Sequence, residues 1–146
     1  MDRAKFINTC CSLCLGGSSM AVLLQACGGV YYALNKVDGN TIIVSKSEFM
    51  YQKKEEQLTR KFVVIQSPLT AFPICLYQIT DSQYSALLMK CTHKGCEVRP
   101  NDYGLVCPCH GSEYDILGNV TNPPAEKSLT HFKINTDDTH IYIHLS

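Results

Sequence analysis

Two short loops that each carry a cysteine and a histidine constrain this sequence more than any other feature. The first reads C-T-H-K-G-C and places His93 two residues after Cys91, and the second reads C-P-C-H-G-S-E-Y and places His110 three residues after Cys107. Thiolate and imidazole ligands at such short spacing suit one metal centre that both loops share. A fold of this chain that uses the pattern must therefore bring the two loops together.

The doubled pattern resembles the Rieske family of [2Fe–2S] proteins, with good matching from about residue 91 to residue 129. The resemblance implies a [2Fe–2S] cluster in which Cys91 and Cys107 bind the inner iron, while His93 and His110 bind the outer one. Two neutral imidazoles in place of two thiolates leave the oxidised core without net charge, so it accepts an electron more readily. Such clusters have reduction potentials of roughly −150 to +300 mV, against about −400 mV for plant-type ferredoxins.

Each loop carries a second cysteine, Cys96 in the first and Cys109 in the second. The resemblance implies that these two cysteines form a disulfide that ties the loops together. One departure from the family concerns the thirteen residues between His93 and Cys107, which are slightly fewer than usual. The shortening predicts a trimmed hairpin between the loops and leaves the ligand positions intact.

Two hydroxyl-bearing residues follow the second loop, and they bear on the reduction potential. Ser112 and Tyr114 stand where high-potential relatives, of the quinol:cytochrome c reductase type, place donors to a bridging sulfide and to a cysteine sulfur. Such donors stabilise the reduced cluster and favour the upper part of the range. In the family, the histidine edges face solvent where a quinol or a partner protein docks, and electron and proton uptake are linked there.

A structural zinc site is the main alternative interpretation of the two loops, because zinc also takes two cysteines and two histidines. The two extra cysteines and the S-x-Y sequence that follows argue against zinc. A set of plain disulfides among the four loop cysteines would leave the paired histidines unexplained.

The rest of the chain has the pattern of strands, and its 146 residues suit one domain. The predicted fold class is all-β: a Rieske-type antiparallel β-sandwich at residues 41–146, with a small cluster-binding subdomain of two loops at about 90–125. A charged run at residues 52–60 predicts a solvated turn, and N-P-P-A at 122–125 resembles a family loop that covers the cluster. Strands are predicted at residues 41–49, 61–66, 74–79, 84–90, 97–100, 104–106, 112–117, 129–135 and 140–145.

The first 26 residues are predicted to be an export signal. Arg3 and Lys5 give a basic start, and the apolar run that follows is too short and too interrupted for a convincing membrane span. Its end, L-Q-A-C-G-G, resembles a bacterial lipoprotein cleavage box, in which Cys27 becomes the lipidated first residue. The start also resembles a twin-arginine signal, although Ala4 replaces the second arginine, so the export route stays open.

Residues 27–40 begin Gly-rich, continue polar, and predict a tether. A lipid at Cys27 would hold the domain on the periplasmic side of a bacterial membrane. An oxidising compartment of that kind permits a stable disulfide. An uncleaved N-terminal membrane helix, which other Rieske proteins use, is the alternative anchor.

By resemblance, the protein carries electrons between a quinol or a periplasmic oxidoreductase and a redox partner protein. Its side chains would position the cluster without making bonds themselves. The thirteen basic and thirteen acidic residues cancel, so nothing indicates a nucleic-acid partner. Two alternatives stay open: a Rieske ferredoxin that serves an oxygenase, whose relatives generally lack the disulfide cysteines, and a non-redox zinc-binding module.

Overall fold

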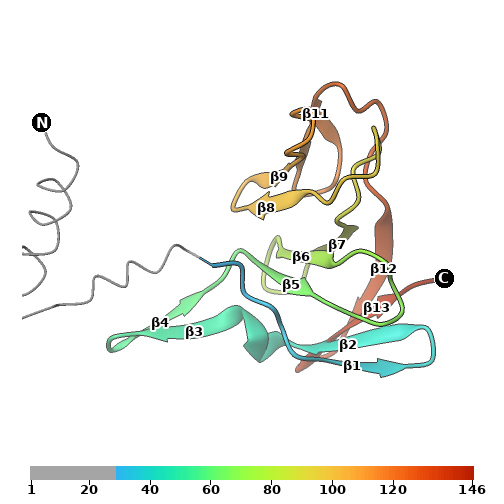
Figure 1. Ribbon diagram of the computed structural model, residues 1–146. Helices are drawn as coiled ribbons and strands as arrows, with labels where there is room; N and C mark the ends of the chain where they lie inside the picture. The colour runs from blue at the N-terminus through green and yellow to red at the C-terminus, as the bar shows by residue number, and fades with distance from the viewer. Residues whose placement is uncertain (1–28) are drawn as a thin grey trace, which may run out of the picture.

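The computed structural model describes residues 29–146, and this part of the chain confirms the all-β prediction (Figure 1). The predicted signal at residues 1–26 and the predicted lipidation site Cys27 lie outside the described residues. One short 3-10 helix, η1 (Lys46–Phe49), interrupts the strands. The strands are β1 (Asn35–Asp38), β2 (Thr41–Ser45), β3 (Met50–Lys53), β4 (Glu56–Thr59), β5 (Phe62–Ile65), β6 (Ile74–Gln78), β7 (Tyr84–Leu88), β8 (Arg99–Asn101), β9 (Gly104–Val106), β10 (Glu113–Asp115), β11 (Val120–Asn122), β12 (His131–Thr136) and β13 (His140–His144).

Seven of these strands form one curled antiparallel sheet in the order β1-β2-β13-β12-β7-β6-β5. Its two edges are joined by the segment that leads into β1. The Val64 N–H donates to the Tyr31 carbonyl at 2.9 Å, and the Ala33 N–H donates to the Val64 carbonyl at 2.8 Å. Residues 31–33 therefore cover the open edge of β5, where unpaired backbone groups would otherwise be exposed.

The tether predicted at residues 27–40 is wrong from Tyr31 onward. Ala33 is buried in the core, and β1 pairs with β2 over four residues. The Gly-rich composition that suggested a tether ends at Gly29, and the apolar residues after it gain more from packing at the sheet edge than from staying in solvent.

We call the seven-stranded sheet the base sheet. A hydrophobic core fills the inside of this curled sheet. Strands β2 and β13 alternate between buried and half-exposed positions, so one side chain in two points inward. These inward residues meet others from the opposite wall, which fixes the register of the sheet. The core consists of Ala33, Ile42, Val44, Phe49, Val63, Ile65, Ile74, Leu76, Ala86, Ile141 and Ile143.

Strands β5 and β6 are buried along nearly their whole length because both faces of the sheet are covered there. Val63 and Ile65 point into the curled sheet, whereas Val64 points outward. The outer face packs against a second sheet of four strands, in the order β11-β10-β9-β8. All four of these strands fall between residues 90 and 125.

The Tyr77 side chain holds the two sheets together at their centre. Its hydroxyl lies 2.6 Å from the carbonyl oxygen of Gly104 and 2.9 Å from that of Asn101, both in the β8–β9 hairpin. Burial is the main cause that raises the pKa of Tyr77 above its ordinary value, so the phenol stays protonated and available as a donor. The hairpin between the two cysteine loops is thereby fixed to the base.

One local prediction is wrong and another is incomplete. Residues 46–49 form η1 instead of extending the strand, because the Ser45 hydroxyl accepts the Ser47 N–H and caps a helical turn. The charged run at 52–60 is solvated and turns at residues 54–55, but its flanks form a hairpin, β3–β4, that was not predicted, with Lys53 opposite Glu56. Most of its side chains are exposed, so the hairpin lacks the alternating apolar pattern that predicts a half-buried strand.

Candidate metal centre

The two cysteine loops have the same backbone geometry. In the first loop, the Gly95 N–H donates to the Cys91 carbonyl at 2.9 Å, and in the second the Gly111 N–H donates to the Cys107 carbonyl at 3.0 Å. Both glycines adopt positive φ angles, 80° and 79°, which disfavour residues with a side chain. Each loop is thus a tight turn that begins at its first cysteine.

A disulfide links the two turns, as the resemblance predicted. Cys96 and Cys109 are bonded at 2.07 Å across a sequence separation of 13 residues. The covalent link holds the loops side by side at the end of the four-stranded sheet. The position of each cysteine–histidine pair is therefore fixed relative to the other.

Loss of this link is expected to destabilise the site. Replacing both Cys96 and Cys109 with serine should lower the free energy of unfolding by about 3 kcal/mol, because the unfolded chain regains the entropy of a closed loop of roughly this size. Urea unfolding, with bound iron followed in parallel, measures the effect. Cys75→Ser, which removes a thiol from β6, should leave iron retention unchanged. Equal iron retention in the disulfide variant and the wild type would contradict the role given to the link.

The first cysteines of the two loops are free, buried thiols. Cys91 is 3% exposed and Cys107 is 1% exposed, and both pack against the outer face of the base sheet. Burial opposes ionisation of Cys91, but hydrogen bonds from the Tyr114 hydroxyl and the His93 backbone N–H outweigh it. The pKa of Cys91 consequently lies below its ordinary value, which favours the thiolate that a metal ligand requires.

The rings of the two loop histidines pack edge to face. Their ring centroids are 4.9 Å apart at an interplanar angle of 86°. His93 is half-buried and His110 is exposed. The Nδ1 atom of His93 is buried, and it has no hydrogen-bond partner among the described residues. A buried ring nitrogen of this kind requires a partner that the protein does not supply, and a metal ion would satisfy it.

The four side chains do not converge on one point. Within residues 29–146, the one group of cysteine, histidine or acidic donor atoms that all lie within 4.8 Å of one another is Cys96, Cys107 and Cys109, and two of these are joined in the disulfide. A tetrahedral zinc site holds its donors within about 4 Å of each other, because its bonds are about 2.0 to 2.3 Å long. No three of the donors of Cys91, His93, Cys107 and His110 lie that close together, which fits a two-iron cluster better than a single zinc ion.

Tyr114 lies where the sequence predicted a donor to a cysteine sulfur. This residue on β10 is 2% exposed, and its hydroxyl oxygen is 3.3 Å from Cys91 Sγ. The hydroxyl has one proton and also lies 3.0 Å from Thr92 Oγ1. Burial and the neighbouring Cys91 raise the pKa of Tyr114, so the phenol stays protonated and can donate.

Thr92 is a site residue that sequence analysis missed, and it determines where the Tyr114 proton goes. The Thr92 hydroxyl lies 2.7 Å from the Lys127 carbonyl, which can only accept, so the threonine proton is used there. The Thr92 backbone N–H also donates to the Tyr114 oxygen at 3.1 Å, which strengthens the tyrosine as a donor. Two acceptors are then left for the tyrosine proton, the Cys91 sulfur and the Thr92 hydroxyl oxygen. A thiolate is the stronger of these two acceptors.

Ser112 is completely buried and has a free donor as well. Its Oγ accepts the Ala125 N–H at 3.0 Å, which leaves the hydroxyl proton available. The same contact ties the proline-rich loop to the second cysteine loop, and the Asn122 side chain donates to the Gly111 carbonyl at 3.0 Å. As the sequence predicted, the proline-rich loop lies against the site.

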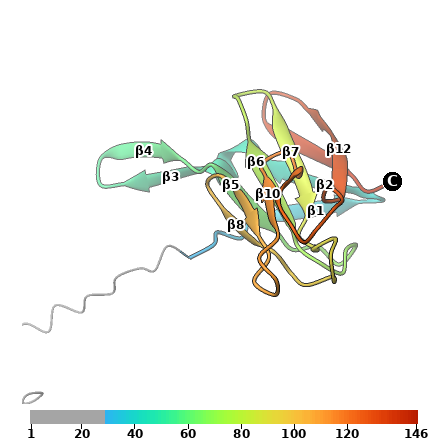
Figure 2. The same cartoon turned by 90° about the horizontal axis from the view of Figure 1, so that it is seen from above.

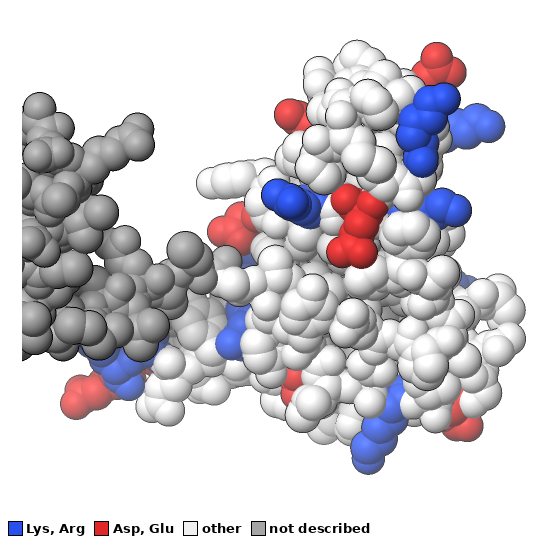
Figure 3. All heavy atoms as spheres, in the orientation of Figure 1, with Lys and Arg blue, Asp and Glu red and all other residues white. Residues whose placement is uncertain are grey.

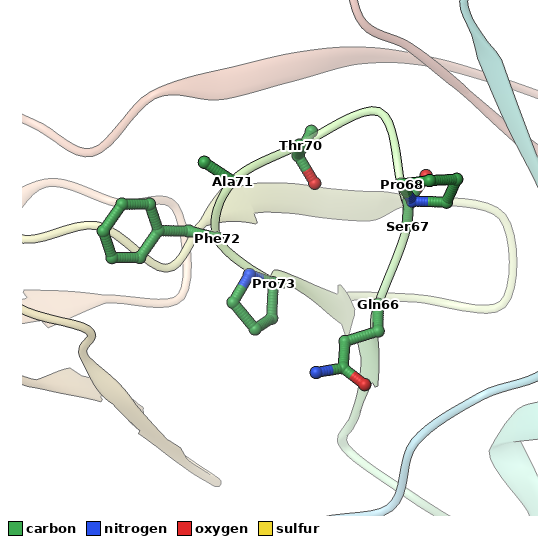
Figure 4. Close-up of a pocket in the computed structure, with 7 residues that line it drawn as sticks. All are labelled: Gln66, Ser67, Pro68, Thr70, Ala71, Phe72 and Pro73. Carbon is green, nitrogen blue, oxygen red and sulfur yellow. The ribbon is translucent and has the colours of Figure 1, made fainter.

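A hollow of about 370 Å³ elsewhere in the molecule does not belong to this centre. It lies inside the loop between β5 and β6 (Figure 4), and no cysteine or histidine lines it. The buried Thr70 hydroxyl is without a hydrogen-bond partner among the described residues, but the hollow brings together no group with metal-binding or redox chemistry. The residues that line it are Gln66, Ser67, Pro68, Thr70, Ala71, Phe72 and Pro73.

Comparison with known proteins agrees with this chemistry. Residues 40–133 match the Rieske [2Fe-2S] domain, which is more than half of the chain and includes both cysteine loops. The cytochrome b6-f complex iron-sulfur subunit 2 of a Nostoc species is 39% identical over 59 residues, which are 39% of this chain and 33% of that subunit. The corresponding subunit of Prochlorococcus marinus is 45% identical over 56 residues, covering 36% of this chain and 31% of the relative.

A solved structure is also similar. The plasma membrane Rieske protein PetC3 from Synechocystis has a TM-score of 0.50 and 28% identity, with 57% of this chain and 85% of that chain covered. The curated relatives are matched over only about a third of their length.

The chain therefore belongs to the Rieske family, and its cofactor is a [2Fe–2S] cluster. Its similar proteins include iron-sulfur subunits of cytochrome b6-f complexes and a plasma membrane Rieske protein.

Proposed function

We propose that this protein transfers single electrons, with Cys91 and Cys107 binding one iron of the cluster and His93 and His110 binding the other. The observation that carries the proposal is the pairing of two buried thiols with two facing imidazoles, one of which has an unpartnered buried nitrogen. When bound, a [2Fe–2S] cluster supplies reversible one-electron chemistry. The residues around it bind it, exclude water and set its potential.

Hydrogen bonding favours a high potential. Tyr114 donates toward Cys91, and Ser112 keeps a free hydroxyl proton in a buried position beside the second loop. A donor stabilises the more negative, reduced state more than the oxidised one. Both residues therefore raise the potential, as expected for the quinol:cytochrome c reductase type.

The exposed edges of His93 and His110 form the surface where electrons enter or leave. We assign the electron donor as a quinol or a periplasmic oxidoreductase, and the acceptor as a redox partner protein. The relatives named as subunits of the cytochrome b6-f complex support this assignment. Basic and acidic side chains are interspersed on the face in Figure 3.

Attachment to a membrane is part of the proposal. We assign Cys27 as the lipid-bearing residue, so that the domain faces the periplasm. In residues 29–146 no helix has the length and apolar character needed to cross a membrane. The similarity to a plasma membrane Rieske protein supports the location, and an N-terminal membrane helix is the competing anchor.

The Tyr114 hydrogen bond gives a quantitative test. Tyr114→Phe is expected to lower the midpoint potential by about 45 to 65 mV, because one hydrogen bond that favours the reduced state is worth about 1 to 1.5 kcal/mol. Ser112→Ala should lower it in the same direction with the cluster retained. Redox titration monitored by electron paramagnetic resonance measures both values.

The matched control is Tyr142→Phe, which removes a hydroxyl that bonds to Asp137 in the β12–β13 hairpin. Its potential should equal that of the wild type. An unchanged potential in both Tyr114→Phe and Ser112→Ala would refute the assignment of these residues.

Metal analysis together with the visible spectrum tests the function as a whole. We expect two irons and two sulfides per chain, and a rhombic paramagnetic signal on reduction. A midpoint well below zero would favour a ferredoxin that serves an oxygenase. A colourless preparation with zinc and no iron would establish the zinc-binding module instead.

A further inference from the structure

Exposed apolar side chains gather at one edge of the base sheet. Of the eleven large hydrophobic residues that are exposed in the described part of the chain, seven lie between Val30 and Tyr51. Leu34 is the most exposed of the seven, at 78%, and Tyr32 is 52% exposed. We define the edge patch as Val30, Tyr31, Tyr32, Leu34, Met50 and Tyr51. It combines the start of the described chain with the base of the β3–β4 hairpin.

A network of polar contacts holds the two parts of the edge patch together. The Arg60 guanidinium lies 3.9 Å from the ring centroid of Tyr31 and 4.7 Å from that of Tyr51. Its Nη1 donates to the Met50 carbonyl at 2.9 Å. The Glu48 carboxylate accepts the Tyr31 hydroxyl at 2.9 Å. These contacts fix Tyr31 and Tyr51 relative to each other, so the patch is built and not a frayed end.

The short stretch of chain between Cys27 and the sheet limits how far the edge patch can lie from Cys27. Tyr31 is the first residue whose backbone is bonded to the sheet. The four residues from Cys27 to Tyr31 span at most about 14 Å even when fully extended. A domain of this size has a radius of gyration of about 13 Å. If Cys27 bears a lipid, as the proposed function states, the linker keeps Tyr31 within about 14 Å of the membrane, a distance comparable with the radius of the domain itself.

We propose that the edge patch lies on the lipid bilayer, with its tyrosines and aliphatic side chains in the interfacial region. Tyrosine is enriched at membrane interfaces because its ring is apolar and its hydroxyl is polar. At the hairpin tip, Lys53 and Lys54 are followed by Glu55 and Glu56, so these charges cancel and apolar contact drives the association. The inference rests on lipid attachment at Cys27.

The contact also orients the cluster site. Figure 1 shows the β8–β11 sheet at the top of the molecule, whereas the β3–β4 hairpin projects at the lower left, and Figure 2 shows the hairpin and the segment entering β1 on the same side. The cysteine loops are thus clear of the bilayer. A periplasmic redox protein can reach His93 and His110 in this orientation.

The chain contains no tryptophan, so a single introduced tryptophan reports on its own surroundings. Full-length Leu34→Trp holoprotein, reconstituted into phosphatidylcholine vesicles with brominated acyl chains, should have its emission quenched at least about twofold relative to unbrominated vesicles. Leu117→Trp places the probe at a 50% exposed position between β10 and β11, and its emission should be unchanged.

The measurements test the membrane contact of the edge patch separately from the lipid anchor at Cys27. Quenching at residue 34 without quenching at residue 117 supports the membrane contact. Equal emission in both vesicle types at residue 34, in a chain that sediments with the vesicles, overturns the contact and leaves the lipid anchor standing. Mass spectrometry of the N-terminal peptide tests the anchor itself: an unmodified Cys27 refutes the anchor and overturns the patch inference that rests on it. The paramagnetic signal of the same samples reports on the cluster independently.

Discussion

Replacing Cys107 with alanine is expected to abolish cluster binding, with iron content falling to background and no paramagnetic signal on reduction. The Cys107 thiol is 1% exposed, and it lies in a turn whose backbone is fixed by the Gly111 and Ser112 hydrogen bonds. Within residues 29–146 no further free cysteine is placed to substitute for it, because Cys109 is in the disulfide and Cys75 lies on β6. One iron would lose half of its protein ligands, which an inorganic cluster does not survive.

Cys75→Ala is the matched control, since Cys75 is also a free and fully buried thiol in the same apolar cluster. Burial raises the pKa of Cys75 well above its ordinary value, so this thiol stays protonated and is a poor ligand. The control should lose stability through the small cavity and keep its full iron content. If Cys107→Ala retained the cluster, the ligand assignment would be wrong.

Gly104→Ala is expected to prevent the four-stranded sheet from forming around the site. Gly104 begins β9 with a φ of 153°, and a Cβ placed there would lie 2.0 Å from the Tyr114 carbonyl oxygen. That atom belongs to the backbone of β10, which pairs with β9, so it cannot move aside without breaking the ladder. We expect a loss of more than about 4 kcal/mol and failure to bind the cluster, because Tyr114 would be displaced from Cys91.

The comparison for this variant is Gly39→Ala in the β1–β2 turn. Gly39 has a φ of 56°, but no atom lies within 4 Å of its Cβ position. The alanine there meets backbone strain alone, which costs roughly 1 to 2 kcal/mol. Thermal unfolding and iron analysis of the two variants separate the cost of backbone strain from the cost of a collision between Cβ and the Tyr114 carbonyl. Equal stability of the two would show that the β9–β10 contact is looser than described.

The two loops that carry a cysteine and a histidine could be found from the sequence because their pattern is local. The cysteine and histidine of each pair are two or three residues apart, so each loop shows its ligand set directly in the sequence. The disulfide followed from the family resemblance and is confirmed by the structure. The base strands were also found, because Val, Ile and Tyr recur in runs where both faces or alternate faces are buried.

The errors share one physical cause. The β3–β4 hairpin is exposed on both faces, so it has no buried stripe to recognise. The segment at residues 31–33 looked like a tether because its partner, β5, lies more than thirty residues further along the chain. In both cases the local sequence lacks the signal, because the hairpin has no buried stripe and the segment at residues 31–33 has no partner nearby in the chain.

The sequence by itself determined the all-β class, the paired ligand loops and the second pair of cysteines, since these depend on spacing within a few residues. Tertiary structure alone decided that Thr92 gives its proton to Lys127 and leaves that of Tyr114 for Cys91, and that an apolar edge patch forms beside β3. Those arrangements join residues 17 to 35 positions apart. Contacts over such distances exist only once the sheets have packed, and no local periodicity encodes them.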